Sequence, residues 1–343
     1  MLHTDTCLIL GAGASKDLGM PLGSELVSEI RNRAEADVRR HDPWNYAPTG
    51  LLRLMPKPLN EKQAQALGQA VQTLHEGALQ FSSIDDFLEY HGRDDAVVSL
   101  GKTAIAQCIM EREGTSLLKP KPGFNPPAPI LEGPINDTWL PTFFRSLIAG
   151  SSPDTIFDRL RIVSFNYDRT VEYYLYHALK RAFALADDDA RAALSHLKIF
   201  HPYGSLGKIS ELGRPPAVPF GTGATASDVA ASIRTYSEQI SDLGLQTQIH
   251  EAMRWARRIV FLGFGFHQQN MKLLAPQDGM DPKPMYASAM GFFEEDRPGL
   301  VERLAMLLPL DKRNIFASNN FGHLGIDRDC CVFFKAYKTT LFN

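Results

Sequence analysis

The sequence predicts an α/β fold: a Rossmann-like parallel sheet with helices on both faces and a helical insert. Short apolar runs alternate with segments of helical periodicity, a pattern typical of parallel strands covered by helices on both sides. The first run, residues 6–11, ends at a glycine turn, and a helical pattern follows from Leu22. Strand, glycine turn and helix in this order open an α/β nucleotide-binding unit.

The later strands and helices divide the chain into a core and an insert. After residues 6–11, strands are expected at 160–165, 197–200, 258–264, 285–290, 314–317 and 331–334. Helices are expected at 61–79, 84–90, 139–149, 170–185, 228–255 and 299–308. The proline-rich stretch 114–133 predicts a loop. We therefore expect one domain, with a Rossmann-like core at 1–36 and 155–343 and an insert, including this loop, at 37–154.

Composition and charge exclude several classes of protein. Hydrophobic residues make up 44% of the 343 residues, and the formal net charge is −3, so no net positive field attracts nucleic acid and direct nucleic-acid binding is not expected. No apolar run approaches the ~18 residues of a membrane span, and the N-terminal residues do not resemble a secretory signal. We expect a cytoplasmic protein without membrane contact.

The glycine turn after the first strand is the first candidate site. Gly11-Ala12-Gly13-Ala14-Ser15 would let the backbone pass close to a pyrophosphate at a helix N-terminus. Lys16 stands where the dehydrogenase fingerprint requires glycine, so that fingerprint is not met. The alternative is a purely structural turn between strand and helix.

Polar residues follow the second strand. Asn166 and Asp168 come directly after residues 160–165, and ligands of open α/β sheets bind beyond the carboxyl ends of the strands. Both side chains are therefore candidates for a pocket. The alternative for Asp168 is a capping role at the helix expected from Thr170.

Two further strands end in candidate motifs. Residues 197–200 lead into the segment 201–205, His-Pro-Tyr-Gly-Ser, and residues 258–264 reach a second glycine turn at 263–265. The alternative for the second of these is a core strand with a flexible end.

Together these motifs resemble the sirtuin-like family, and specifically its bacterial branch associated with anti-phage defence. The resemblance also includes Gly19-Met20-Pro21 and the segment Ser-Ile-Asp-Asp-Phe-Leu at 83–88. The order and spacing of the motifs match from residue 6 to about 270.

The resemblance implies a glycohydrolase that cleaves NAD⁺ to nicotinamide and ADP-ribose and thereby depletes the NAD⁺ of an infected cell. NAD⁺ is then the substrate, and no further cofactor is expected. By motif position, Gly11, Ala12, Gly13 and Ser15 would line the diphosphate, and Gly263 and Gly265 the adenosine half. Asn166 would lie beside the nicotinamide ribose with Asp168 supporting it, and Pro21 and Ser205 would complete the NAD⁺ site.

The general base departs from the family pattern. Tyr203 stands where the family has a histidine, and His201 lies two residues earlier. In an extended chain both side chains would face the same side, and an imidazole is a far better base at neutral pH than a phenol. We therefore expect His201 to be the base and Tyr203 to contact the ribose. Two alternatives remain: a His201 bonded only to backbone, and a non-catalytic NAD⁺ or ADP-ribose binding module that signals to a partner.

The cysteines argue against a zinc-dependent deacetylase. Deacetylating sirtuins hold zinc with two Cys-x-x-Cys pairs, which Cys7, Cys108, Cys330 and Cys331 do not form; no metal is expected. Because unregulated loss of NAD⁺ would kill the host, we expect control by homo-oligomerisation or by a separately encoded partner, such as an ATPase or an Argonaute-type protein. The strands expected after residue 270 leave little room for a sensor domain.

Overall fold

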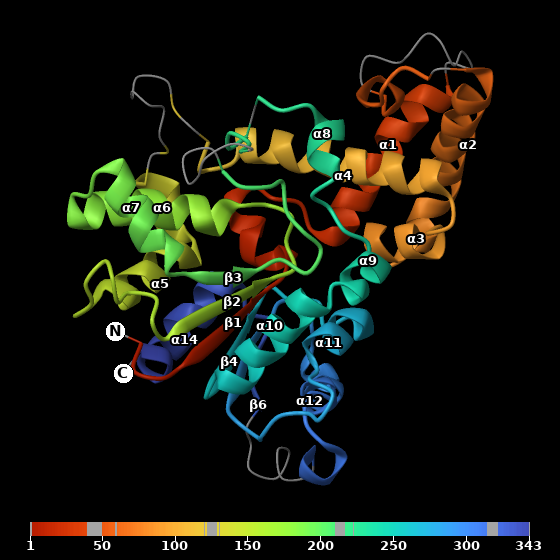
Figure 1. Ribbon diagram of the computed structural model, residues 1–343. Coiled ribbons are helices and arrows are strands. Elements are labelled where there is room, and N and C mark those ends of the chain that lie inside the picture. Colours follow the sequence, from red (N-terminus) through yellow and green to blue (C-terminus); the bar gives the residue numbers. More distant parts are fainter. Residues whose placement is uncertain are drawn as a thin grey trace.

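The computed structural model describes residues 2–39, 50–58, 60–119, 121, 129, 131–209, 217–221, 223–313 and 322–342. A six-stranded sheet forms its centre (Figure 1), in the order β3-β2-β1-β4-β5-β6 and with every pairing parallel. The strands are β1 (Thr6–Leu10), β2 (Leu160–Ser164), β3 (Lys198–Phe200), β4 (Arg258–Leu262), β5 (Met285–Ala289) and β6 (Gly322–Ile326). This is the Rossmann strand order, and it confirms the predicted fold class.

Helices cover both faces of this sheet, as continuous apolar strands require. Cys7 and Ile9 of β1 belong to a core shared with α1 (Gly23–Val38), α10 (Leu243–Trp255), α11 (Gln268–Leu274) and α12 (Arg297–Ala305). Leu8 and Leu10 belong to a second core on the opposite face. That core includes α5 (Trp139–Ile148), α6 (Thr170–Phe183), α7 (Asp187–Ser195) and α14 (Cys330–Phe342).

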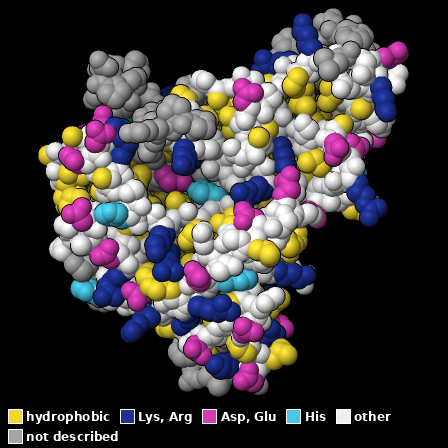
Figure 2. All heavy atoms as spheres, in the orientation of Figure 1, with side chains coloured by type: hydrophobic (Ala, Val, Ile, Leu, Met, Phe, Trp, Pro, Cys, Tyr) yellow, Lys and Arg dark blue, Asp and Glu magenta, His cyan; other side chains and the backbone are white. Residues whose placement is uncertain are grey.

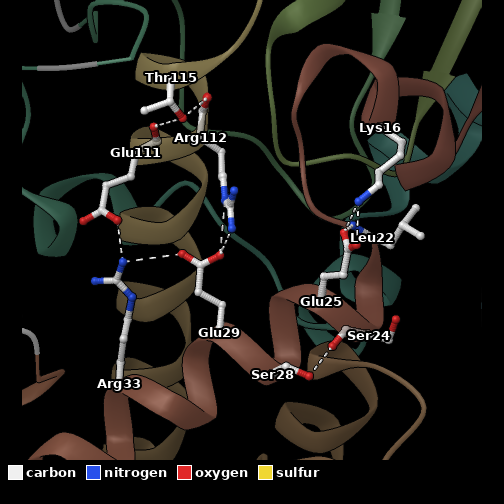
Figure 3. Close-up of polar contacts among 10 residues, drawn as sticks. All are labelled: Lys16, Leu22, Ser24, Glu25, Ser28, Glu29, Arg33, Glu111, Arg112 and Thr115. Carbon is white, nitrogen blue, oxygen red and sulfur yellow. Dashed lines mark hydrogen bonds and ion pairs between the residues drawn. The ribbon is translucent and has the colours of Figure 1, made fainter.

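The helical insert packs on α1 at one end of the molecule (Figure 1). It contains α2 (Glu61–Gly77), α3 (Ile84–Tyr90) and α4 (Asp95–Thr115). Figure 3 shows ion pairs between α1 and α4: Arg33 contacts Glu111, and Arg112 donates to Glu29 at 2.8 Å. The helix α5, expected within the insert, instead covers the sheet.

Two predictions near the C-terminus need correction. Residues 331–334 do not form a strand but lie in α14, whose apolar residues recur at helical spacing and face the sheet: Cys330, Phe333, Phe334, Tyr337 and Leu341. Trp139 of α5 stacks on Phe334 there, with ring centroids 5.5 Å apart. The strand β6 was not predicted because its sequence, with two glycines, contains no apolar run. The strand predicted at 314–317 lies outside the described residues.

The long helix predicted at 228–255 is wrong as a single element. It divides into α8 (Ala226–Ala230), α9 (Tyr236–Ser241) and α10. Thr235 caps α9 by accepting from the Glu238 N–H, and Asp242 caps α10 by accepting from the Leu245 N–H. Capping side chains of this kind begin new helices inside a continuous amphipathic pattern.

The surface carries charges of both signs. Figure 2 shows acidic and basic side chains interspersed over one face of the molecule. Among the described residues, no helix combines the length and the apolar character that crossing a membrane requires.

Candidate functional site

A cavity of about 510 Å³ opens at the carboxyl ends of β1, β2, β4 and β5, within the usual size of a ligand pocket. The chain runs from β1 through β2 to β3 on one side and then crosses to β4 on the other side of β1. The cavity therefore lies at the topological switch point, where α/β sheets bind ligands. Its walls include Gly11–Gly13, Pro21, Ser83–Asp86, Phe165–Asp168, Tyr203, Gly263–Gly265 and Ser288.

The two glycine turns pack directly against each other. The Gly11 N–H donates to the Leu262 carbonyl and the Gly13 N–H to the Gly263 carbonyl, both at 3.0 Å. A Cβ on Gly13 would lie 2.7 Å from the Gly263 Cα. These glycines therefore allow two backbones to touch, and their N–H groups are not available to a diphosphate. The residues after Gly11 form a 3₁₀ helix, η1 (Ala12–Leu18), rather than a simple turn.

This packing predicts a large effect of Gly263→Ala on stability. Gly263 has φ +56°, and its Cβ would lie 2.1 Å from the Ala14 nitrogen. Left-handed backbone costs about 1–2 kcal/mol for a residue with a Cβ, and the overlap adds to it, so we expect a loss above about 3 kcal/mol in urea unfolding. Gly291→Ala is the matched control, because Gly291 has φ +82° and open space around its Cβ. Equal losses in the two variants would contradict the packing argument.

Ser15, Asn166 and Asp168 form one hydrogen-bond network beside the cavity. Ser15 Oγ donates to Asp168 Oδ1 at 3.1 Å, and Asn166 Nδ2 donates to Ser15 Oγ at 3.1 Å. Asn166 and Asp168 line the cavity, whereas Ser15 is buried behind them at 1% exposure. The structure thus brings these three predicted residues together, although Ser15 supports the wall and does not line it.

Asp168 contacts the start of α6 and also lies at the cavity. Its Oδ1 accepts from the Thr170 N–H at 3.1 Å and from the Thr170 hydroxyl at 2.5 Å, at the start of α6. Burial raises the pKa of the carboxyl, and the hydrogen bonds from Thr170 and Ser15 partly oppose this. Asp168 therefore binds the first residue of α6, although the N-cap residue itself is Arg169, and its carboxyl group also lines the cavity.

Asn166 is oriented for ligand binding. Because its nitrogen donates to Ser15, its Oδ1 is the atom left to accept from a ligand, and no donor among the described residues contacts it. A ribose hydroxyl is a suitable donor for such an oxygen.

The premise that His201 and Tyr203 face the same side is wrong. The strand β3 ends at Phe200, and the chain then turns, with the Gly204 N–H donating to the His201 carbonyl. Tyr203 lines the cavity, and its hydroxyl donates to Asn270 Oδ1 at 2.8 Å. His201 does not line this cavity but, with Ser205, lines a separate, open cavity of about 450 Å³. Strand periodicity did not apply because the strand had already ended.

Both ring nitrogens of His201 face hydrogen-bond acceptors. Its Nε2 lies 2.9 Å from Glu172 Oε1 and its Nδ1 3.2 Å from the Asn166 carbonyl oxygen. Since both nitrogens face acceptors, these contacts favour a proton on each nitrogen and disfavour a role as base. Burial alone would lower the pKa of His201, but the Glu172 carboxylate and the Asn166 carbonyl raise it overall. His201 thus holds the backbone of the Asn166 loop.

This contact predicts a pH-dependent contribution to stability. Because folding raises the pKa of His201, the contribution is fully present below the unfolded value of about 6.5 and is lost as pH rises through the folded-state pKa. Below about pH 6.5, we expect His201→Gln to lower the free energy of unfolding by about 1.5–3 kcal/mol, as for the loss of hydrogen bonds to a charged group. Urea unfolding of both proteins over a pH series measures the difference. A difference that does not decline at higher pH would contradict the imidazolium.

Asp85 and Tyr167 were not predicted as site residues. Asp85, on α3 of the insert, lines the cavity and accepts a hydrogen bond from the Tyr167 hydroxyl. Burial raises the pKa of Asp85 to about 6, and the bond from Tyr167 partly opposes this. The segment 83–88 was singled out in the sequence, but nothing in it indicated that its side chains would reach the cavity.

The cavity is acidic. Five aspartates line it, namely Asp17, Asp85, Asp86, Asp168 and Asp329. Among its described lining residues Lys16 is the sole lysine or arginine, and Figure 3 shows its ammonium held by Glu25, at 2.7 Å from Oε2. Such walls favour a ligand in which positive charge is present or develops.

No protein-family model matches the chain, and no curated protein matches it either. Fold and site together define an α/β protein with a Rossmann-like parallel sheet and a ligand cavity at its switch point. Among the described residues, no three histidine, cysteine or acidic side chains gather as metal ligands, and the four cysteines are free and buried.

Proposed function

We propose that this chain binds NAD⁺ in the cavity at the switch point and hydrolyses it to nicotinamide and ADP-ribose. The observation that carries the proposal is that Asn166 and Asp168, held together by the buried Ser15, line a cavity of about 510 Å³ at the carboxyl ends of β1 and β2. The resemblance of the same residues to the sirtuin-like family supports NAD⁺ as the ligand.

The chemistry suits an acidic cavity. The N-glycosidic bond of NAD⁺ breaks with departure of neutral nicotinamide, and positive charge develops on the ribose as in other glycoside cleavages. A fixed carboxylate such as Asp168 stabilises that charge. Asn166 Oδ1 is free to accept from a ribose hydroxyl, which would fix the sugar against the attacking water.

A non-catalytic NAD⁺ or ADP-ribose binding module is the second candidate. The observation that favours it is the state of the two residues at the expected base position. Burial raises the pKa of Tyr203 far above its ordinary value, and His201 lies outside the cavity with both ring nitrogens on acceptors. These two observations disfavour a base at either position.

Nicotinamide release separates the two candidates. Purified chain is incubated with NAD⁺, release is followed by chromatography, and binding is followed in parallel by thermal shift. We expect both stabilisation and release. Stabilisation by NAD⁺ without release of nicotinamide would favour the binding module. The absence of both stabilisation and release would contradict both candidates.

The cellular role proposed from the resemblance is NAD⁺ depletion during anti-phage defence in the cytoplasm. Control by a homo-oligomer or by a separately encoded partner belongs to the same proposal. Measuring release with and without the proteins encoded beside this one tests it, and we expect the partner to change the rate.

A further inference from the structure

The helical insert brings a carboxylate into the cavity. Asp85 lies in α3, yet it lines the same cavity as Asn166 from β2 and Tyr203 from the segment after β3. Tyr167 and Tyr203 lie beside each other there, with ring centroids 6.5 Å apart. The insert therefore forms part of the wall of this cavity.

Asp85 and Asp168 differ in the number of hydrogen bonds that each carboxylate accepts. Asp168 Oδ1 accepts from Ser15, from the Thr170 N–H and from the Thr170 hydroxyl, which fixes the carboxylate. Asp85 Oδ1 accepts from the Tyr167 hydroxyl, which is the one side-chain donor to Asp85 among the described residues. Asp86, its neighbour, is instead held by the Ser82 hydroxyl. Asp85 is thus held by fewer donors than Asp168, which leaves its carboxylate freer to accept from a water molecule.

We propose that Asp85 is the general base of the NAD⁺ cleavage, an inference that rests on the proposed function. The bond between C1′ of the ribose and N1 of nicotinamide breaks, and its electron pair goes to N1. The water oxygen bonds to C1′, and a water proton goes to Asp85 Oδ2 and then to solvent. The products are nicotinamide, ADP-ribose and one proton.

The surroundings of Asp85 suit this role. The titratable groups that act on it are the Tyr167 hydroxyl and the carboxylate of Asp86, and Asp85 acts in turn on Tyr203. Burial raises the pKa of Asp85 to about 6, near the optimum for a base at neutral pH. Charged residues of the helices around α3 pair with one another: Arg33 with Glu111, Arg112 with Glu29, and Lys102 with Glu238.

Asp85→Asn tests the inference. The amide keeps the shape and an acceptor for Tyr167, so the fold and NAD⁺ binding should persist. We expect kcat for nicotinamide release to fall by roughly 10²–10⁴-fold, the range for loss of a general base, with the Kd for NAD⁺ within a few-fold of wild type. Asp95→Asn, an equal change of charge at an exposed position of the same insert, should retain wild-type kcat.

The pH profile distinguishes a base from a structural residue. In the wild type, kcat/KM should fall below about pH 6, and Asp85→Asn should lack this limb. Tyr167→Phe removes a hydrogen bond that lowers the pKa of Asp85, so its limb should move to higher pH. If the wild type releases nicotinamide and Asp85→Asn does so with the same kcat, the assignment of Asp85 is wrong but the proposed function stands. The same holds if the acidic limb of the pH profile is unchanged in Asp85→Asn. No release by the wild type would overturn the proposed function and the inference with it.

Discussion

Asn166→Ala should lower nicotinamide release by roughly 10²–10³-fold, as expected when a group that holds the transition state is removed. The substitution deletes the amide oxygen that would accept from the ribose. Ser15 keeps its bonds to Asp168 and Thr170, so the wall of the cavity should remain. Steady-state release by the purified variant and its melting temperature measure the two effects separately.

The control for Asn166 is Asn136→Ala. Asn136 is exposed in the short 3₁₀ helix Gly133–Asp137, away from the cavity lining, and we expect wild-type turnover there. If Asn166→Ala were folded and turned over NAD⁺ at the wild-type rate, the site would be assigned to the wrong residues.

Glu113→Ala should cause the largest loss of stability, about 3–5 kcal/mol, because it leaves a buried guanidinium without its partner. Glu113 of α4 is completely buried and lies 2.6 Å from Arg169 Nη2. It also accepts from the N–H groups of Arg169 and Gly221, at 3.0 and 3.1 Å. The pair thus joins the insert to the segment that carries Asp168. Urea unfolding measures the loss.

Glu111→Ala is the matched control two residues away on α4. Its side chain is 41% exposed and pairs with Arg33 near the surface, where ion pairs contribute about 0–1 kcal/mol. If the alanine variant does not fold, Glu113→Gln replaces it in the measurement, because glutamine keeps the side-chain volume and a hydrogen-bond acceptor. Equal losses at positions 111 and 113 would show that the buried pair does not anchor the insert.

The fold could be predicted from sequence because buried parallel strands leave short apolar runs that local patterns reveal. Residues 6–10, 160–164 and 258–262 are such runs, and all three are strands. The strand β6 and the helix α14 were missed for opposite reasons. β6 contains two glycines and few apolar residues, whereas the aromatic residues of α14 resemble a strand over four positions and show their helical spacing only over twelve.

The candidate site could be predicted only where it follows directly from strand ends. Asn166 and Asp168 follow β2, and the structure brings them to the cavity. Asp85 could not be placed, because its position depends on how α3 packs on α1 and α4, and no local pattern encodes that contact. The positions of His201 and Tyr203 depend on a turn that ends β3 at Phe200, one residue before the periodicity argument begins.

A crystal structure of the Asn166→Ala variant with NAD⁺ tests the central claim most directly, because the variant should bind the dinucleotide and leave it uncleaved. We expect intact NAD⁺ across the carboxyl ends of β1 and β4, with the nicotinamide ribose beside position 166 and its C1′ facing Asp85. NAD⁺ bound elsewhere, or a cavity that stays empty at millimolar NAD⁺, would contradict it.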